Sequence, residues 1–248
     1  MTHVVAVAGK GGVGKTTVSS LLVQLLAAEQ GGTVLAVDAD PNSNLAEKLG
    51  MEPRGSIGEI RNRIVEDPSL VPVSMSKHEY MALQMQGSLA EDERGIDLLV
   101  MGRPQGEGCY CFVNNVLRDT LNRMLPRYAF AVVDNEAGME HLARRTLPQM
   151  DTLFLVSDPS ATGVRTALRL WSMTRELGMQ TGRSVLLLNG VRGPLPDDLI
   201  PQEDDLEVHF LPFDERVEAA NRRGEPIVPD LESTLYQTLH SILLPVLR

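Results

Sequence analysis

The most informative segment of this chain is Gly9-Lys10-Gly11-Gly12-Val13-Gly14-Lys15-Thr16. It matches the pattern G-x-x-x-x-G-K-[ST], in which backbone N–H groups turn inward around phosphate oxygens. Lys15 would supply a positive charge to the β- and γ-phosphates, and the hydroxyl of Thr16 would bind Mg²⁺. Thr17 begins an amphipathic stretch whose helix dipole would favour the same anions. The pattern predicts a loop that binds a nucleoside triphosphate and magnesium.

Apolar, β-rich runs alternate with amphipathic stretches on both sides of this loop. Near-continuous apolar runs are typical of parallel strands buried on both faces. Such strands are predicted at Val4–Ala8, Val34–Val37, Ile96–Met101, Phe130–Val133, Leu153–Val156, Val185–Leu188 and Val208–Leu211. Helices are predicted at Thr17–Glu29, Val113–Met124, Met139–Leu147 and Val164–Leu177. The alternation predicts an α/β chain with one doubly wound domain over residues 1–248, in which helices flank a mostly parallel sheet.

The composition limits the classes of partner. The 248 residues carry a formal net charge of -10, which disfavours both nucleic acid and an anionic membrane surface as partners. No apolar run approaches the ~20 residues of a membrane span. The apolar start lacks a basic segment and runs directly into the glycine loop, so we expect a buried strand and a cytoplasmic protein. The amphipathic stretch Leu231–Leu247 has one strong base, Arg248, and we expect it to pack against the sheet.

Acidic residues follow two of the predicted strands. Asp38 and Asp40 come after Val34–Val37, and Asp134 ends the strand that begins at Phe130. Ligands of such sheets bind beyond the carboxyl ends of the strands, where carboxylates suit the organisation of magnesium and of water. Gly138 could place its N–H on the γ-phosphate, as a switch segment does. The alternatives are an ordinary Asp-Pro turn at Asp40 and a helix-capping role for Asp134.

Two cysteines, Cys109 and Cys111, precede or open a predicted helix, where thiol pKa values fall and thiolates suit metal. A closed zinc site needs four ligands, and the chain has no further cysteine. A two-fold axis would supply the pair twice, so shared ligation of Zn²⁺ or Ni²⁺ predicts a homodimer. The alternative is that both cysteines are small buried packing residues.

Lys10 makes the glycine loop resemble the deviant phosphate loop of the MinD/ParA/nitrogenase iron protein superfamily. The resemblance implies that Lys10 reaches the nucleotide of the partner subunit, where it would cancel charge on the transferring phosphoryl group. It also implies that Asp40 orients the attacking water and that Asp38 belongs to the magnesium shell. Asn189, after the strand Val185–Leu188, would read the adenine edge.

The base is expected to be adenine. The run Asn189-Gly190-Val191-Arg192 lacks the Asn-Lys-x-Asp pattern that reads guanine, so ATP is the expected nucleotide. The second segment of the base pocket would be Leu211–Asp214, with Pro212 and Asp214 as its contact residues. An Asn-Gly turn without any ligand is the alternative at Asn189.

Two further stretches narrow the resemblance. Gly106-Glu107-Gly108-Cys109-Tyr110-Cys111 and Asp134-Asn135-Glu136-Ala137-Gly138 together look like the CooC-type ATPases that mature nickel-containing carbon monoxide dehydrogenase. The similarity covers the chain from the first strand to the loop at Pro212–Asp214. It implies a nucleotide-gated homodimer that inserts a metal into carbon monoxide dehydrogenase or a related acetyl-CoA synthase.

Two other functions remain open at this point. One is an ATP-dependent electron carrier like nitrogenase iron protein, although that family spaces its cluster cysteines far apart. The other is a positioning ATPase of the MinD/ParA type, which would need a basic patch or a basic amphipathic tail.

Overall fold

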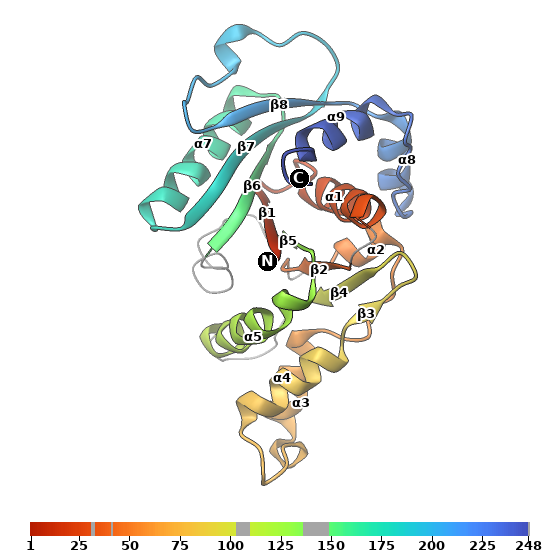
Figure 1. The fold of residues 1–248 in the computed structure, drawn as a ribbon, viewed down its shortest axis with the longest axis vertical. Coiled ribbons are helices and arrows are strands. Elements are labelled where there is room, and N and C mark those ends of the chain that lie inside the picture. The colour runs from red at the N-terminus through yellow and green to blue at the C-terminus, as the bar shows by residue number, and fades with distance from the viewer. Residues whose placement is uncertain (31–32, 41, 103–109, 136–148, 248) are drawn as a thin grey trace.

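The computed structural model describes residues 1–30, 33–40, 42–102, 110–135 and 149–247. Within these residues the strands form an eight-stranded sheet in the order β3-β4-β2-β5-β1-β6-β7-β8 (Figure 1). In chain order the strands are β1 His3–Gly9, β2 Val34–Asp38, β3 Ala90–Glu91, β4 Ile96–Val100, β5 Phe130–Asp134, β6 Gln149–Ser157, β7 Gln180–Val191 and β8 Glu207–Pro212.

The pairing confirms the predicted α/β fold class. All neighbouring strands are parallel except β3, which runs antiparallel to β4. Each of the seven predicted strands is present, with ends that differ from the prediction by a few residues. Strand β3 was not predicted, because two residues are too few to show a periodic pattern.

Helices cover both faces of the sheet. They are α1 Lys15–Gln30, α2 Leu45–Leu49, α3 Ile57–Glu66, α4 Lys77–Gly87, α5 Tyr110–Met124, α7 Ala161–Glu176, α8 Glu215–Arg223 and α9 Thr234–Leu243. Successive residues of a strand point to opposite faces, so β1 contributes to two separate clusters. Val4 and Ala6 pack with residues of α3, α4, α5 and α7, whereas Val5 and Val7 pack with α1, α2 and α9. Buried strands therefore read as continuous apolar runs.

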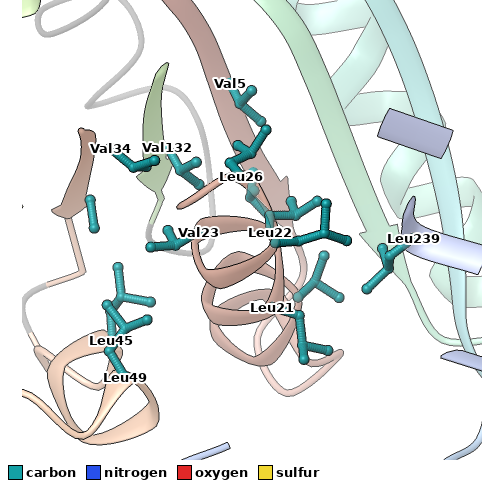
Figure 2. Packing of buried hydrophobic residues seen from close by; sticks show 14 of the residues in the cluster. Val5, Leu21, Leu22, Val23, Leu26, Val34, Leu45, Leu49, Val132 and Leu239 are labelled. Atoms are coloured by element: carbon teal, nitrogen blue, oxygen red, sulfur yellow. The ribbon is translucent and has the colours of Figure 1, made fainter. Parts of the chain in front are cut away.

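Helix α1 leads directly out of the glycine loop and fixes it to the sheet. Figure 2 shows Leu26 of α1 next to Val5 of β1, with Leu45 and Leu49 of α2 in the same cluster. Each of these side chains is buried. Apolar burial is worth roughly 25 cal/mol per Å² of surface removed from water. This packing therefore fixes α1 against β1 and α2.

Four helices were not predicted from the sequence: α2, α3, α4 and α8. Two of them carry a local signal, since Ser56 with Glu59 and Ser76 with Glu79 form capping boxes at the starts of α3 and α4. Helix α8 has no fully buried residue, and its apolar contacts with the core come from the partly buried Val217 and Ala220. The helix predicted at Met139–Leu147 lies outside the described residues.

The C-terminal stretch packs as predicted. Helix α9 buries Leu235, Tyr236, Leu239, Ile242 and Leu243 and contacts α1 and β8. In the described part of the chain, no helix combines the length and apolar character that a membrane crossing requires.

Candidate functional site

The glycine loop connects β1 to α1 at the carboxyl edge of the sheet. A Cβ atom at Gly9 would lie 2.2 Å from the carbonyl oxygen of Val156 in β6, and Gly14 has a φ of 92°. Both positions exclude a larger residue, the first for lack of space and the second because L side chains rarely adopt that φ. The Gly11 and Gly12 positions are exposed, whereas Val13 is buried against α1. The constraints at Gly9 and Gly14 therefore fix the path of the loop backbone.

The two lysines of the loop lie in different surroundings. Lys15 is buried, and its Nζ donates a hydrogen bond to the backbone oxygen of Lys10 at 3.2 Å. The side chain of Lys10 is exposed. The side chain of Lys15 therefore lies across the loop that would hold the phosphates. The side chain of Lys10 is accessible to a second molecule.

Three strand ends bring the predicted carboxylates to this loop. Strand β5 lies between β1 and β2, and Asp134 is the register partner of both Val7 and Asp38. Asp134 is 1% exposed and Asp38 is 0% exposed. Asp134 accepts a hydrogen bond from the hydroxyl of Thr16, and its Oδ1 accepts one from Ser19 Oγ at 2.9 Å. The hydroxyl of the phosphate-loop threonine and a buried carboxylate are therefore in contact.

Burial dominates the electrostatics of both carboxyls. It raises the pKa of Asp38 to about 7, against the opposing effect of backbone N–H donors at Leu45 and Asp40. It also raises the pKa of Asp134 to about 6, although Thr16, Ser19 and Lys15 lower it. Mutual repulsion between the two carboxyls adds to the effect at Asp38. Buried acidic groups of this kind gain from a bound cation.

Asp40 lies in a tight turn beyond β2. Its Oδ1 accepts hydrogen bonds from the backbone N–H and the side-chain amide of Asn42, at 2.8 Å and 2.9 Å. Ser43 follows with a φ of 54°, unusual for a residue other than glycine. Ala39 N–H donates to the backbone oxygen of Asp134, so the turn is tied to β5. Asp40 is half-buried, as a group that meets a nucleotide and solvent would be.

A cavity of about 260 Å³ adjoins the loop on the side of β7 and β8. Asn189 lies at its wall, and its Nδ2 donates a hydrogen bond to the backbone oxygen of Val13 at 2.9 Å. The residues that line it come from the glycine loop, α1, the ends of β6, β7 and β8, α8 and α9. They are Gly12, Val13, Gly14, Thr17, Val18, Leu21, Asp158, Asn189, Gly190, Pro212, Phe213, Asp214, Val217, Glu218, Asn221 and Leu235.

The structure brings the three predicted base-pocket residues to one cavity and adds a structural role for two of them. Asn189 braces the loop through its amide nitrogen, which leaves its Oδ1 to accept a hydrogen bond from an amino group. Asp214 is the N-cap of α8, and its Oδ1 accepts from the backbone N–H groups of Arg216 and Val217. Pro212 ends β8.

Sequence reasoning missed three polar residues of the cavity. Asp158 follows β6 directly, so the rule that identified Asp38 and Asp134 would have found it. Glu218 and Asn221 lie on α8, and the side chain of Asn221 accepts a hydrogen bond from the Thr17 hydroxyl at 3.4 Å. Because α8 was not predicted, no sequence pattern placed these two residues near the loop.

Several predicted site residues lie outside this geometry. Cys109 and Gly138 are outside the described residues, and Cys111 is described only as the second residue of α5. Among the described residues, no group of three or more His, Cys, Asp or Glu side chains is placed to hold a metal. Magnesium in nucleotide sites needs only one or two protein oxygens beside the phosphates. The pair formed by Thr16 and Asp134 fits that requirement.

Comparison with known proteins finds relatives that match over most of this chain. Residues 4–227 match the family model described as the CobQ/CobB/MinD/ParA nucleotide binding domain. An ATP-binding protein of Methanocaldococcus jannaschii is 36% identical, over 90% of this chain and 90% of its own length. The carbon monoxide dehydrogenase accessory protein CooC of Rhodospirillum rubrum is 29% identical, over 98% of this chain and 96% of its own length.

Solved structures share the fold. The MinC:MinD cell division protein complex of Aquifex aeolicus contains a chain that superimposes with a TM-score of 0.73 at 21% identity, over 99% of this chain and 95% of that chain. MinD of Pyrococcus horikoshii, complexed with Mg-ADP, gives a TM-score of 0.69 at 20% identity, over 99% and 96%. At these identities the likeness concerns the arrangement of the sheet and helices.

Proposed function

Because this chain belongs to the CobQ/CobB/MinD/ParA family of nucleotide-binding domains and is an ATPase, we propose that its ATP hydrolysis drives the insertion of a metal into a client enzyme. The cargo would be Ni²⁺ or Zn²⁺, carried between two copies of the chain. The client would be carbon monoxide dehydrogenase or a related acetyl-CoA synthase. The observation that carries the proposal is the 29% identity to CooC over nearly the whole chain, together with the sequence Cys109-Tyr110-Cys111.

The hydrolytic half of the proposal follows from the loop and the strand ends. Lys15 binds the β- and γ-phosphates, and the backbone N–H groups from Gly9 to Thr16 surround them. Thr16 and Asp134 hold Mg²⁺, with Asp38 in the surrounding shell. Magnesium, when bound, neutralises charge on the phosphate oxygens.

Water and the transferred phosphoryl group are handled by residues at the rim of the loop. Asp40 accepts a hydrogen bond from the attacking water and so orients it. Lys10 of a second copy contacts the γ-phosphate, in keeping with its exposed side chain. Gly138 donates its N–H to the same phosphate. In the base cavity, Asn189 accepts from the adenine amino group beside Pro212 and Asp214.

The metal half of the proposal rests on thiolate chemistry. Cys109 and Cys111 of each copy give four sulfur ligands, enough for a tetrahedral Zn²⁺ or a square-planar Ni²⁺. Thiols must lose their protons to bind a metal, so metal affinity rises with pH. A change of dimer geometry between nucleotide states would favour one coordination over the other. Release to the client would then follow hydrolysis.

Metal analysis of anaerobically purified protein tests this function. We expect one metal per two chains, with a sulfur first shell in X-ray absorption spectra, and tight binding lost in Cys109→Ser and Cys111→Ser. Both variants should still hydrolyse ATP. A metal-free dimer with unchanged ATPase activity would favour a positioning ATPase instead. A brown protein with iron and sulfide would indicate an electron carrier.

A further inference from the structure

A hydroxyl on α1, that of Ser19, contacts a buried carboxylate at the end of β5. Ser19 is 0% exposed, and its Oγ donates to Asp134 Oδ1 at 2.9 Å. Ser19 and Thr16 are three residues apart on α1, so they lie on the same face of the helix. Helix α1 packs against β5, and both hydroxyls meet the same carboxylate.

This second contact is absent from the phosphate-loop pattern, which ends at Thr16. The terminal torsion of an aspartate is broad, so one hydrogen bond leaves the plane of the carboxylate poorly fixed. Two donors on one rigid helix restrict it much more. A buried carboxylate without a sufficient set of donors is also costly, and the Ser19 hydroxyl is one of the donors that offset this cost.

We propose that Ser19 is a positioning residue, which orients the Asp134 carboxylate toward the magnesium-binding hydroxyl of Thr16. The inference rests on the assignment of Thr16 and Asp134 to magnesium in the proposed function. Ser19 itself touches neither nucleotide nor metal. It acts by holding the carboxylate in one orientation, so its removal should weaken the contribution of magnesium to nucleotide binding and leave the metal-free affinity intact.

The chain offers a matched control one residue away. Ser20 is also 0% exposed and lies on the same helix, but its Oγ donates to the backbone oxygen of Thr17 at 2.9 Å. Ser20→Ala therefore removes a buried hydroxyl and its hydrogen bond without touching Asp134. Any effect of Ser19→Ala that Ser20→Ala lacks belongs to the contact with the carboxylate.

Calorimetric titration with ADP, in MgCl₂ and in EDTA, tests the inference. The parent chain should bind ADP more tightly with magnesium. Ser19→Ala should keep its affinity in EDTA and lose about tenfold of the magnesium-dependent gain, as expected for one hydrogen bond to a charged group. Ser20→Ala should match the parent in both buffers, and Ser19→Thr, which keeps the hydroxyl, should retain the gain.

The contrary outcomes are distinct. A full magnesium-dependent gain in folded Ser19→Ala would overturn the positioning role. A parent chain whose ADP affinity ignores magnesium would refute the magnesium assignment itself. If Ser19→Ala melts at a much lower temperature than Ser20→Ala, Ser19→Cys replaces it, because a thiol of similar size is a weaker donor. Its magnesium-dependent gain must then fall below that of the parent.

Discussion

At the scale of single residues, we expect Lys15 to contribute to ATP binding and Asp40 to ATP hydrolysis. Lys15 lies buried across the glycine loop, whereas Asp40 lies half-buried in a turn beyond β2. We expect Lys15→Ala to weaken ATP binding by about a hundredfold, since it removes a charge-assisted contact. Asp40→Ala should bind ATP normally and hydrolyse it ~10²-fold or more slowly, because only the orientation of water is lost. Equilibrium binding and single-turnover hydrolysis measure the two effects separately.

An Asp40→Ala variant that hydrolysed ATP at the parent rate would contradict the role of the turn. In that case the hydrogen bonds from Asn42 would give the carboxylate a structural role only. Parent-like ATP affinity in Lys15→Ala would be the more serious result, since it would mean that nucleotide binds elsewhere.

Asp38 makes stability depend on pH in the nucleotide-free protein. Its pKa is raised by burial to about 7, so the folded state favours the neutral carboxyl. The contribution to stability is fully present below the unfolded pKa, near 4, and is lost as pH rises to 7. At ~1.4 kcal/mol per pKa unit, the change is on the order of 4 kcal/mol. Asp134, whose pKa is raised to about 6, changes stability in the same direction.

Urea denaturation of the parent and of Asp38→Asn, at a series of pH values between 4 and 8, measures this effect. Asparagine cannot ionise, so the unfolding free energy of the parent should fall relative to that of Asp38→Asn as pH rises toward 7. Titrating groups that do not interact with Asp38 cancel in that difference, whereas Asp134, which repels it, adds to the fall. A difference that is constant over the whole range would show that Asp38 ionises normally in the folded protein.

At the scale of elements, α8 depends on its cap. It buries no residue, yet Val217, Glu218 and Asn221 bring it to the wall of the base cavity. Asp214→Ala should destabilise α8 by about 1 kcal/mol, because the first turn of the helix loses its cap. It should also weaken ATP binding, because α8 forms part of the cavity wall. Asp214→Asn should retain both the helix and the affinity, since asparagine is as good a cap. Hydrogen exchange of the α8 amides and calorimetry with ATP give the two readouts.

The asparagine variant separates two roles of Asp214. If it binds ATP as weakly as the alanine variant while α8 stays protected from exchange, the carboxylate itself contacts the nucleoside. If it binds ATP like the parent, capping explains the position.

At the scale of the whole molecule, exposed Lys10 predicts that nucleotide controls association. With Mg²⁺ present and thiol-binding metals removed, we expect monomers without nucleotide and dimers with a slowly hydrolysed ATP analogue. A ligand shifts such an equilibrium only if it binds one state better, and a γ-phosphate contacted from both copies would do so. Lys10→Ala should bind ATP and remain monomeric. Sedimentation velocity reports the species directly, and one unchanging species in every nucleotide state would exclude the gate.

The local features of this protein could be predicted from its amino-acid sequence. The glycine loop, the strands around it and the acidic residues that end them depend on short stretches of chain. Glycine at positions 9 and 14 satisfies a backbone requirement, and the apolar runs reflect burial of both sheet faces. The contact between α9 and the sheet followed from an amphipathic pattern of the same local kind.

The contacts between these segments became known from the three-dimensional fold. The order of strands puts β5 between β1 and β2, and this brings Asp134 beside Asp38 and under the hydroxyls of Thr16 and Ser19. Likewise, Asn189 reaches Val13 across 176 positions of sequence. Helix α8 lines the base cavity although none of its residues is fully buried. Such contacts arise from pairing between strands that are distant in the sequence. The free energy of this pairing depends on the whole assembled sheet, so it cannot be predicted from any single segment.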